Sequence, residues 1–434
     1  MSAGSESLAT ELNRSCDCGV VDLPALRSHL DRHLADDGVV QLIEQSHPHL
    51  FSDTPVFIDS EHVAGMQRII DGVEQVVRTP QYQNEVLAGA PAISRIDRGP
   101  LGVFMGFDFH ITASGPRLIE INTNAGGALL NIAVWSAHRA CCSAANESRA
   151  DQPVAPQLEG QIVAMFENEW RLARGNCPLR SIAIVDENPR EQYLYPEFLL
   201  AKRLFESRGF AAFIVDPSEL EITGDGVQSA GVPIDLIYNR LTDFYFAEPR
   251  DQVLREICER DLAVITPHPR AHALYANKRN LAIFSDAAKL AQLGAAQPAI
   301  DNLLHGIPTT RRAAGSDDAW WRDRKNWFFK PSGGFGSRGT YRGDKLTKRV
   351  FAEVMNGEYV AQRFVPAGER VRSTTRGRES FKVDVRCYVY AGRIQLMAAR
   401  MYQGQTTNFR SEGGGFAPVY VTDCEPESFR TTCA

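Results

Sequence analysis

A glycine-rich segment that follows a short aromatic run constrains the fold of this chain most strongly. Residues 327–329 are aromatic, Lys330 and Pro331 come next, and four glycines then fall between positions 333 and 339. Glycine lets a backbone approach an anion closely, and successive backbone N–H groups can form an anion-binding nest. The segment matches neither the Walker phosphate loop nor the dinucleotide-binding fingerprint. A lysine at a strand end directly before such a loop favours a nucleotide-phosphate site over a flexible hairpin turn. The residues assigned to this site are Lys330, Ser332, Gly333, Gly334, Gly336 and Ser337.

Two short strands early in the chain carry three oxygen-bearing side chains. Residues 102–110 and 118–122 read as the two strands of a hairpin. Glu120 and Asn122 are two residues apart on one strand and therefore share a face, and Asp108 lies on the neighbouring strand. Carboxylate and amide oxygens suit Mg²⁺. The alternative, in which Glu120 is a surface charge beside a turn, is disfavoured by its apolar neighbours, because an unpaired carboxylate is costly to bury.

A third segment, residues 358–366, reads as an apolar strand with one inward-facing polar residue. Its backbone could bind the edge of an adenine ring, with Val360 and Phe364 on either side of the ring. A plain core strand is an equally good interpretation of this segment taken alone. The residues assigned to the nucleotide here are Gln362, Arg363, Phe364 and Val365.

Two further strands, at residues 383–390 and 394–400, concentrate arginines near a second glycine cluster. Arg386, Arg400 and Arg410 could neutralise a phosphoryl group during its transfer, a reaction in which charge stabilisation dominates catalysis. Each arginine alone is a weak signal, because surface arginines are common. Four more arginines, which could meet a phosphate or an acidic substrate, are Arg370, Arg372, Arg376 and Arg378.

The rest of the chain alternates between helical and strand patterns. Residues 1–20 are predicted to be disordered or loosely attached, residues 21–88 carry helical periodicity, and the polar stretch 143–157 reads as a linker. A helix is predicted over 272–292 and a separate β-rich lobe from residue 326 to the C-terminus. Short buried strands separated by helical segments, which indicate a largely parallel α/β sheet, are predicted at 181–186, 211–215 and 234–240.

Charge and composition exclude some classes of function. The net charge is −6 and the basic residues are scattered, which is not typical of a nucleic-acid-binding protein. The first residues are polar, and no apolar run approaches the ~20 residues of a membrane span, so neither secretion nor membrane insertion is expected. A metal site formed by Cys16, Cys18 and the pair at 141–142 is one interpretation of the nine cysteines. Reduced thiols in a cytoplasmic protein are the expectation.

These segments resemble the ATP-grasp carboxylate ligases, especially bacterial glutathione synthetase and the ribosomal-protein glutamate ligases. The likeness lies in motif order and local spacing over about two-thirds of the chain. In that family a lysine precedes the first ATP lobe, and residues 272–278 resemble the segment that carries it, which makes Lys278 a predicted ATP ligand. Asp384, beside Arg386, matches the region that meets the acyl phosphate. The resemblance implies an α/β ATP-grasp fold with a preceding Rossmann-like domain.

The order of the segments departs from that of the bacterial enzymes, because the metal motif precedes the other motifs. Eukaryotic glutathione synthetase shows a similar arrangement, so the resemblance implies a circular permutation. It also predicts that residues 100–130 pack against residues 380–415. The expected units are an N-terminal helical segment with the permuted metal-binding part at 1–142, a linker and connecting helix at 143–177, a Rossmann-like substrate domain at 178–265 and the ATP-grasp lobes at 266–434.

The resemblance implies a reaction in which ATP and Mg²⁺ convert a carboxylate into an acyl phosphate, which an amine then attacks to form an amide and release phosphate. The residues alone imply only Mg-nucleotide phosphoryl transfer. A kinase that stops at that transfer and a non-catalytic ATP-binding module are the alternatives. Arg240, Asn408 and Gly414 are candidates for contacting the acid or its phosphate. The expected partners are small carboxylates and amines, without nucleic acid or membrane, and a homodimer is compatible with the sequence.

Overall fold

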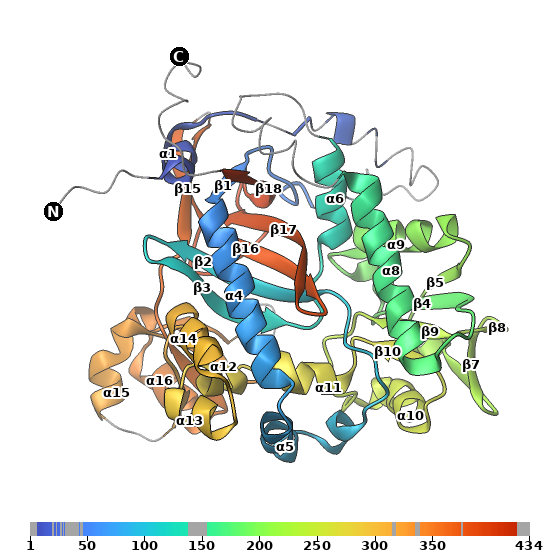
Figure 1. Ribbon diagram of the computed structural model, residues 1–434. Coiled ribbons are helices and arrows are strands. Elements are labelled where there is room, and N and C mark those ends of the chain that lie inside the picture. Colours follow the sequence, from blue (N-terminus) through green and yellow to red (C-terminus); the bar gives the residue numbers. More distant parts are fainter. Residues whose placement is uncertain are drawn as a thin grey trace.

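The computed structural model describes residues 7–19, 47–137, 154–314, 318–334, 339–374 and 376–422, with a few more between 21 and 43. In this part of the chain a large mixed sheet forms the centre, a small lobe lies below it and a parallel α/β domain lies beside it (Figure 1). Gly336 and Ser337 of the predicted phosphate loop lie outside the described residues, as does most of the predicted linker at 143–157.

The central sheet takes its strands from both ends of the chain. Its neighbouring strands are antiparallel except for the first pair, which is parallel. The strands lie in the order β1 (Val56–Asp59), β18 (Gly415–Thr422), β17 (Arg393–Tyr402), β16 (Gly377–Tyr390), β2 (Met105–Thr112) and β3 (Gly115–Asn122), with β15 (Gly368–Thr374) also paired to β16. The predicted hairpin therefore joins the sheet of residues 381–400, which confirms that residues 100–130 pack against residues 380–415. The circular permutation itself remains a prediction.

Alternation along β16 gives the sheet two different faces. Phe381, Val383 and Val385 point into a core shared with helix α4 (Ser60–Val77), which crosses the sheet in Figure 1. Because successive side chains on a strand point to opposite faces, Asp384 and Arg386 lie on the other face. The far end of that second face is covered by α6 (Ala128–Ser136) and α8 (Ala155–Arg174). The uncovered end of the second face carries the polar residues of the site.

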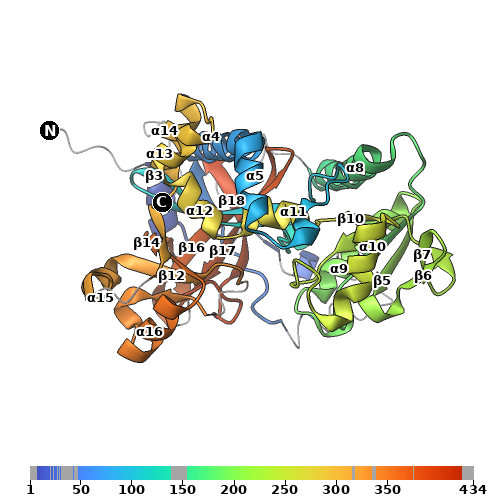
Figure 2. The same ribbon diagram turned by 90° about the horizontal axis from the view of Figure 1, so that it is seen from below.

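The α/β domain contains a four-stranded parallel sheet, seen apart from the central sheet in Figure 2. Helix α9 (Tyr195–Ser207) joins β4 (Ser181–Val185) to β5 (Ala211–Val215), and α10 (Gln252–Arg260) joins β9 (Leu236–Asn239) to β10 (Val264–Thr266). The predicted strands are confirmed. The strands lie in the order β10 (Val264–Thr266), β9 (Leu236–Asn239), β4 (Ser181–Val185) and β5 (Ala211–Val215), with a small excursion formed by β6 (Glu221–Thr223), β7 (Gly226–Ser229) and β8 (Val232–Pro233).

The small lobe is a four-stranded antiparallel sheet with its own apolar core. Its strands lie in the order β11 (Thr310–Ala313), β14 (Tyr359–Arg363), β12 (Trp327–Pro331) and β13 (Tyr341–Arg342). The helices that precede or cover it are α11 (Pro269–Ala271), α12 (Arg279–Phe284), α13 (Ala287–Gln292), α14 (Gln297–Gly306), α15 (Asp318–Asp323) and α16 (Lys348–Asn356). Because β15 to β18 join the central sheet, the prediction of one β-rich lobe from residue 326 onward is wrong.

The single helix predicted over 272–292 is also wrong, because the chain breaks twice. A π-helical turn spans His272–Ala276, and extended backbone at Asn277 ends it. The backbone N–H of Lys278 donates to the Ser332 carbonyl at 3.0 Å instead of continuing a helical ladder. A second break follows at Asp286, whose side chain caps α13. These breaks place Lys278 beside the glycine-rich loop.

The N-terminal segment is ordered where it is described, so the prediction of disorder over residues 1–20 is wrong for helix α1 (Leu8–Ser15). The Asn13 side chain exchanges two hydrogen bonds with the backbone of Phe57, at 2.7 and 2.9 Å. The fully buried Arg370 guanidinium donates to the carbonyls of Pro55 at 2.7 Å and Cys16 at 2.6 Å. α1 thus packs against strands β1 and β15 of the central sheet.

The other arginines near position 370 are also engaged with the protein. Arg372 donates to the Gly413 carbonyl and pairs with Asp53, both at 3.1 Å. Arg378 donates to the Arg14 carbonyl, and Arg376 pairs with glutamates. The expectation that this run meets a phosphate or an acidic substrate is therefore not supported, because its cations hold the N-terminal segment and neighbouring loops.

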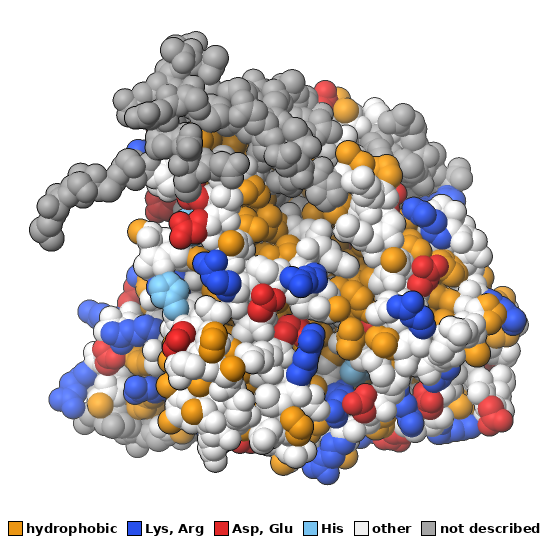
Figure 3. Space-filling model, viewed as in Figure 1, with side chains coloured by type: hydrophobic (Ala, Val, Ile, Leu, Met, Phe, Trp, Pro, Cys, Tyr) orange, Lys and Arg blue, Asp and Glu red, His pale blue; other side chains and the backbone are white. Residues whose placement is uncertain are grey.

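Two surface and covalent features bear on the setting of the protein. On the face shown in Figure 3, basic and acidic side chains are interspersed rather than gathered by sign. None of the helices described here is both long and apolar enough to cross a bilayer.

Cys18 is disulfide-bonded, so the expectation of reduced thiols is wrong for this residue. A cytoplasmic location stays a prediction, since stable disulfides are more typical of oxidising compartments.

Candidate active site

A cavity of about 400 Å³ lies between the small lobe and the polar face of the central sheet. This volume is within the range of small-molecule binding sites. Its walls combine segments that are far apart in the sequence, including the hairpin β2–β3, strand β12, the end of β14 and strands β16 and β17. The predicted site residues that line it are Asp108, Glu120, Asn122, Lys330, Gln362, Arg363, Phe364, Val365, Asp384, Arg386 and Arg400.

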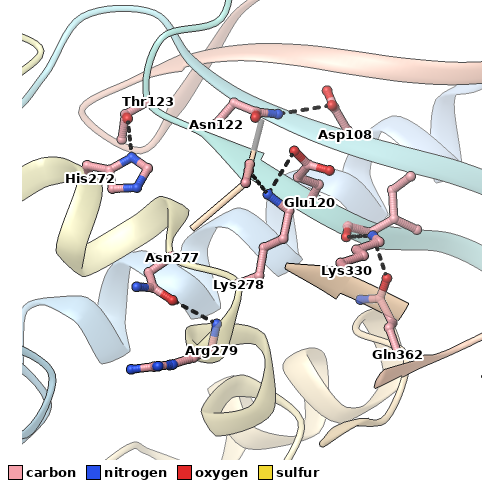
Figure 4. Close-up of polar contacts among 12 residues, drawn as sticks. Asp108, Glu120, Asn122, Thr123, His272, Asn277, Lys278, Arg279, Lys330 and Gln362 are labelled. Atoms are coloured by element: carbon pink, nitrogen blue, oxygen red, sulfur yellow. Dashed lines mark hydrogen bonds and ion pairs between the residues drawn. The ribbon is translucent and has the colours of Figure 1, made fainter. Parts of the chain in front are cut away.

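Two buried lysines contact neighbouring residues of β3 in the hairpin (Figure 4). Lys330, at the end of β12, donates from Nζ to the Ile119 carbonyl at 2.7 Å and to Gln362 Oε1 at 2.9 Å. Lys278 donates to the Gly334 carbonyl at 2.6 Å, and its Nζ lies 3.5 Å from Glu120 Oε1. Burial lowers the pKa of Lys330 to about 8, despite the opposing effect of Glu120. The two ammonium groups and one carboxylate form a compact charged cluster.

An irregularity in β3 explains how Lys330 reaches the hairpin. Asp108 pairs with Glu120 but the next residue, Phe109, pairs with Leu118, so Ile119 has no cross-strand partner. Such a bulge changes the direction of backbone groups and is common beside active sites. Here the Ile119 carbonyl accepts the hydrogen bond from Lys330. The bulge therefore attaches the small lobe to the central sheet at the cavity.

Two arginines converge on Asp108 across three neighbouring strands. Arg386 lies directly opposite Asp108 and donates to its two oxygens, from Nε and Nη2, both at 2.7 Å. Arg400 reaches the same carboxylate at 2.9 Å and donates from Nε to Asp384 at 2.6 Å. Burial raises the pKa of Asp108, but the two guanidinium groups outweigh that effect and lower it to about 2. The carboxylate is therefore ionised and holds both arginines at the cavity wall.

The predicted adenine strand borders the cavity with its C-terminal end. The Phe364 backbone N–H donates to the Asn326 carbonyl at 2.8 Å, and the Val365 carbonyl accepts from His110 Nδ1 at 3.0 Å. The Arg342 guanidinium lies 4.4 Å from the centre of the Phe364 ring. The buried Gln362 side chain is held by Lys330, so it positions that lysine.

The loop that follows β3 ties the hairpin to the α/β domain and to the π-helical turn. Thr123 Oγ1 lies 3.3 Å from His272 Nδ1, and the Asn124 side chain accepts from Arg240 at 2.6 Å. The His272 ring stacks on Phe244 with the ring centres 3.9 Å apart. Burial, aided by Lys278, lowers the pKa of His272 to about 3, so the ring is neutral. These contacts fix the turn that leads into Lys278.

The oxygen donors of the hairpin fit a Mg²⁺ ion unequally. Glu120 is partly exposed to the cavity. The Asn122 Nδ2 donates to Asp108 at 3.1 Å, which leaves its Oδ1 as the coordinating atom. Both Asp108 oxygens already accept from arginines, so its predicted role as a direct ligand stays a prediction. No group of three or more His, Cys, Asp or Glu side chains in the described chain could hold a metal. A Mg²⁺ here would therefore also need oxygens from its nucleotide.

Eight predicted residues in the described part of the chain do not line the cavity, and one of them is Lys278, which lies beside the lining residue Glu120. Arg240 is buried against α9, with Glu197 3.9 Å away and Tyr238 accepting at 3.1 Å. The Asn408 amide donates to carbonyls within its own loop, Arg410 is exposed, and Gly414 closes a turn onto Ser411. Ser332, Gly333 and Gly334 begin the glycine-rich loop beside Lys278, but they are also absent from the cavity wall. The predicted substrate and phosphate roles of these residues remain untested.

Several cavity residues were not predicted from the sequence. A simple signal could have found them, because each lies two positions from a predicted residue on the same strand and so shares its face. His110 follows Asp108, Lys382 precedes Asp384, Tyr402 follows Arg400 and Phe328 precedes Lys330. Thr407, whose hydroxyl donates to Asp384, comes from a loop and has no comparable signal.

Comparison with solved structures places this arrangement in a known fold. The structure aligns with a glutathione synthetase-like effector (GSS30) from Globodera pallida in its apo form, over 92% of this chain and 97% of that chain, with a TM-score of 0.55 and 10% sequence identity. A second match, the ATP-grasp ligase PsnB complexed with minimal precursor, Mg and ADP, covers 53% of this chain and 90% of that chain at 14% identity, with a TM-score of 0.26. No family model and no curated protein sequence matches the chain.

The first of these matches shows that the chain has a glutathione synthetase-like fold, which is the fold that the resemblance in sequence implied.

Proposed function

We propose that the protein is an ATP- and Mg²⁺-dependent ligase that activates a carboxylate as an acyl phosphate and joins it to an amine, releasing ADP and phosphate. One observation carries the proposal. Lys330, Glu120 and the arginine pair come from separate parts of the chain, yet they line one nucleotide-sized cavity between two β-sheets, and Lys278 lies 3.5 Å from Glu120. This combination suits phosphoryl transfer, in which positioning and charge neutralisation supply most of the catalysis.

The two lysines have the role of holding the phosphates of ATP. Lys330 is buried at the cavity wall, and Lys278 lies where the glycine-rich loop begins. Both are held in place by backbone carbonyls, so their ammonium groups are positioned before a ligand arrives. A phosphate oxygen that replaced one of these carbonyls would exchange a neutral acceptor for a charged and stronger one.

The arginine pair has the role of stabilising the charge on the transferred phosphoryl group. Arg386 is held by Asp108, and Arg400 is held by Asp384. Both arginines line the cavity. A guanidinium cannot lose its proton under ordinary conditions and can bind two phosphoryl oxygens at once. The substrate carboxylate attacks the γ-phosphorus of ATP and ADP leaves, which forms the acyl phosphate. The amine then attacks the acyl carbon, an amide forms and phosphate leaves. Mg²⁺, held by Glu120, Asn122 and phosphate oxygens, would neutralise further phosphate charge.

The experiment that tests the proposal combines binding with turnover. Titration calorimetry with ATP, with and without Mg²⁺, measures whether the cavity takes the nucleotide. A panel of small carboxylic acids crossed with amines is then screened for ADP release, and the products are identified by mass spectrometry. We expect ADP release that needs an acid and rises with an amine, together with an amide product.

The variants sharpen that screen. Lys330→Ala should bind ATP more weakly, whereas Lys345→Ala, which changes an exposed lysine outside the cavity, should bind ATP like the unaltered protein. ADP release that needs the acid but never the amine would identify a kinase instead. ATP binding without any ADP release across the panel would identify a non-catalytic module, and absence of ATP binding would refute the proposal.

A further inference from the structure

His110 lies where the hairpin meets the predicted nucleotide strand. It follows Asp108 by two positions on β2, so its ring occupies the same polar face of the central sheet. The ring lines the cavity together with Val365 and Pro366. The sequence motifs and the proposed chemistry give this residue no role.

The protonation of the ring can be deduced from its neighbour. His110 Nδ1 lies 3.0 Å from the Val365 carbonyl, which can only accept a hydrogen bond. Nδ1 therefore carries the hydrogen. In a neutral imidazole the other nitrogen, Nε2, then bears a lone pair and acts as an acceptor.

The surroundings of the ring keep it neutral. Burial lowers the pKa of His110, and Lys330 and Arg400 act in the same direction. Asp384 and the Val365 carbonyl oppose this effect without reversing it. Arg117, the cross-strand neighbour on β3, adds another positive charge near the residue. The cavity thus contains an acceptor among many donors.

We propose that His110 recognises the nucleoside part of ATP by accepting a hydrogen bond at Nε2. The lysines and the arginine pair mark the phosphate end of the cavity, and His110 is fixed to the strand assigned to adenine. The hydrogen donated to Nε2 belongs either to the 6-amino group of the base or to a ribose hydroxyl. Both sources share one chemistry, a neutral O–H or N–H donor. The inference rests on the proposed ATP-binding function.

Nucleotide analogues test this on the unaltered protein. Titration calorimetry compares ATP with purine riboside triphosphate, which lacks the 6-amino group, and with 2′-deoxy-ATP and 3′-deoxy-ATP, each of which lacks one hydroxyl. Loss of one hydrogen bond in a buried site should weaken one of these analogues about tenfold. The analogue that weakens identifies the donor. Equal affinity for all four nucleotides would overturn the proposal.

Two variants separate recognition from structure. His110→Asn can keep a donor near the Val365 carbonyl but has no group at the Nε2 position, whereas His110→Gln can place an amide there. We expect His110→Asn to bind ATP and the sensitive analogue equally, and His110→Gln to retain part of the discrimination. Melting temperatures check that both variants fold. Undiminished discrimination in a folded His110→Asn variant would overturn the proposal.

The outcomes for ATP itself separate this inference from the proposed function. If ATP does not bind at all, the proposed function and this inference both fail; if ATP binds without discrimination, only this inference fails.

Discussion

Arg386 and Asp108 are 278 residues apart in the sequence, and they form a two-point ion pair inside the molecule with both N–O distances at 2.7 Å. The carboxylate is buried and also binds Arg400. Three charged side chains are therefore arranged at the cavity by the pairing of three strands. The Asp108 carboxylate therefore positions both arginines at the cavity and also stabilises the folded protein.

Replacing that carboxylate should affect stability as well as turnover. Asp108→Asn leaves two buried guanidinium groups short of a counter-charge, which should cost about 3 kcal/mol of unfolding free energy. Denaturant unfolding measures this value, and an ADP-release assay should show loss of activity. An Asp108→Asn variant as stable as the unaltered protein would contradict the structural role assigned to the ion pair.

Glu120→Gln provides the matched comparison. Glu120 is partly exposed and lies 3.5 Å from Lys278. We expect a smaller loss of unfolding free energy than in Asp108→Asn, because solvent can partly replace the Glu120 carboxylate. Mg-dependent ATP turnover should nevertheless be lost. Retained turnover in this variant would place the metal elsewhere.

ATP affinity should depend on Lys330 and on pH. Lys330→Ala should weaken ATP binding by roughly 1–3 kcal/mol, the scale of one charge-assisted contact. The pKa of Lys330 is lowered to about 8 without ligand, and phosphates favour its protonated form. Affinity should thus be full below pH 8 and decrease as pH rises above it. Calorimetry at several pH values checks this, and Lys330→Gln should remove the dependence.

A buried acid far from the cavity should destabilise the protein at neutral pH. Neither carboxylate oxygen of Asp251 has a hydrogen-bond partner in the described structure, and burial together with Asp243 raises its pKa to about 7. The folded state then binds a proton more tightly than the unfolded state, so the stabilisation present at low pH is lost as pH rises from about 4 to 7. Asp251→Asn should therefore raise the melting temperature at pH 8 but not at pH 4. The exposed Asp225→Asn should change neither value.

The N-terminal helix should be needed for stability through Arg370. The fully buried Arg370 side chain donates to several backbone carbonyls, and Arg370→Ala would leave these carbonyls without a donor. Each unsatisfied buried acceptor costs about 1–3 kcal/mol, so we expect a loss of at least that size. Arg349→Ala, an exposed control on α16, should cost less than about 0.5 kcal/mol. Equal unfolding free energies for the two variants would show that the helix contributes little.

Many of the residues singled out from the sequence line one cavity, because they follow strand alternation. The two-residue spacing of Glu120 and Asn122 was enough to place both on one face, and the apolar runs around Asp384 and Arg386 marked a buried strand. Strands of this kind are recognised locally, since burial on one face imposes a period of two. The glutathione synthetase-like fold followed from the resemblance of these segments to a known family.

The remaining features depend on long-range contacts that no local pattern encodes. The eight-residue α1 is too short to be stable alone, and hydrogen bonds from Asn13 and Arg370 hold it. The bulge at Ile119 and the break before Lys278 arise where the small lobe meets the hairpin. The pairing of Arg386 with Asp108 depends on the register between β16 and β2. The sequence of one strand taken alone does not determine this register.

The strand order of the central sheet has a consequence for synthesis of the protein. β2 and β3 leave the ribosome long before β16, their partner, has been translated. Until β16 is made, the edge of β2 that pairs with it is unpaired. The α/β domain is contiguous in sequence and can already fold during this time. An exposed strand edge is a template for pairing with other chains. A nascent chain stalled or truncated before β16 would therefore present an incomplete sheet and should be a substrate for chaperones.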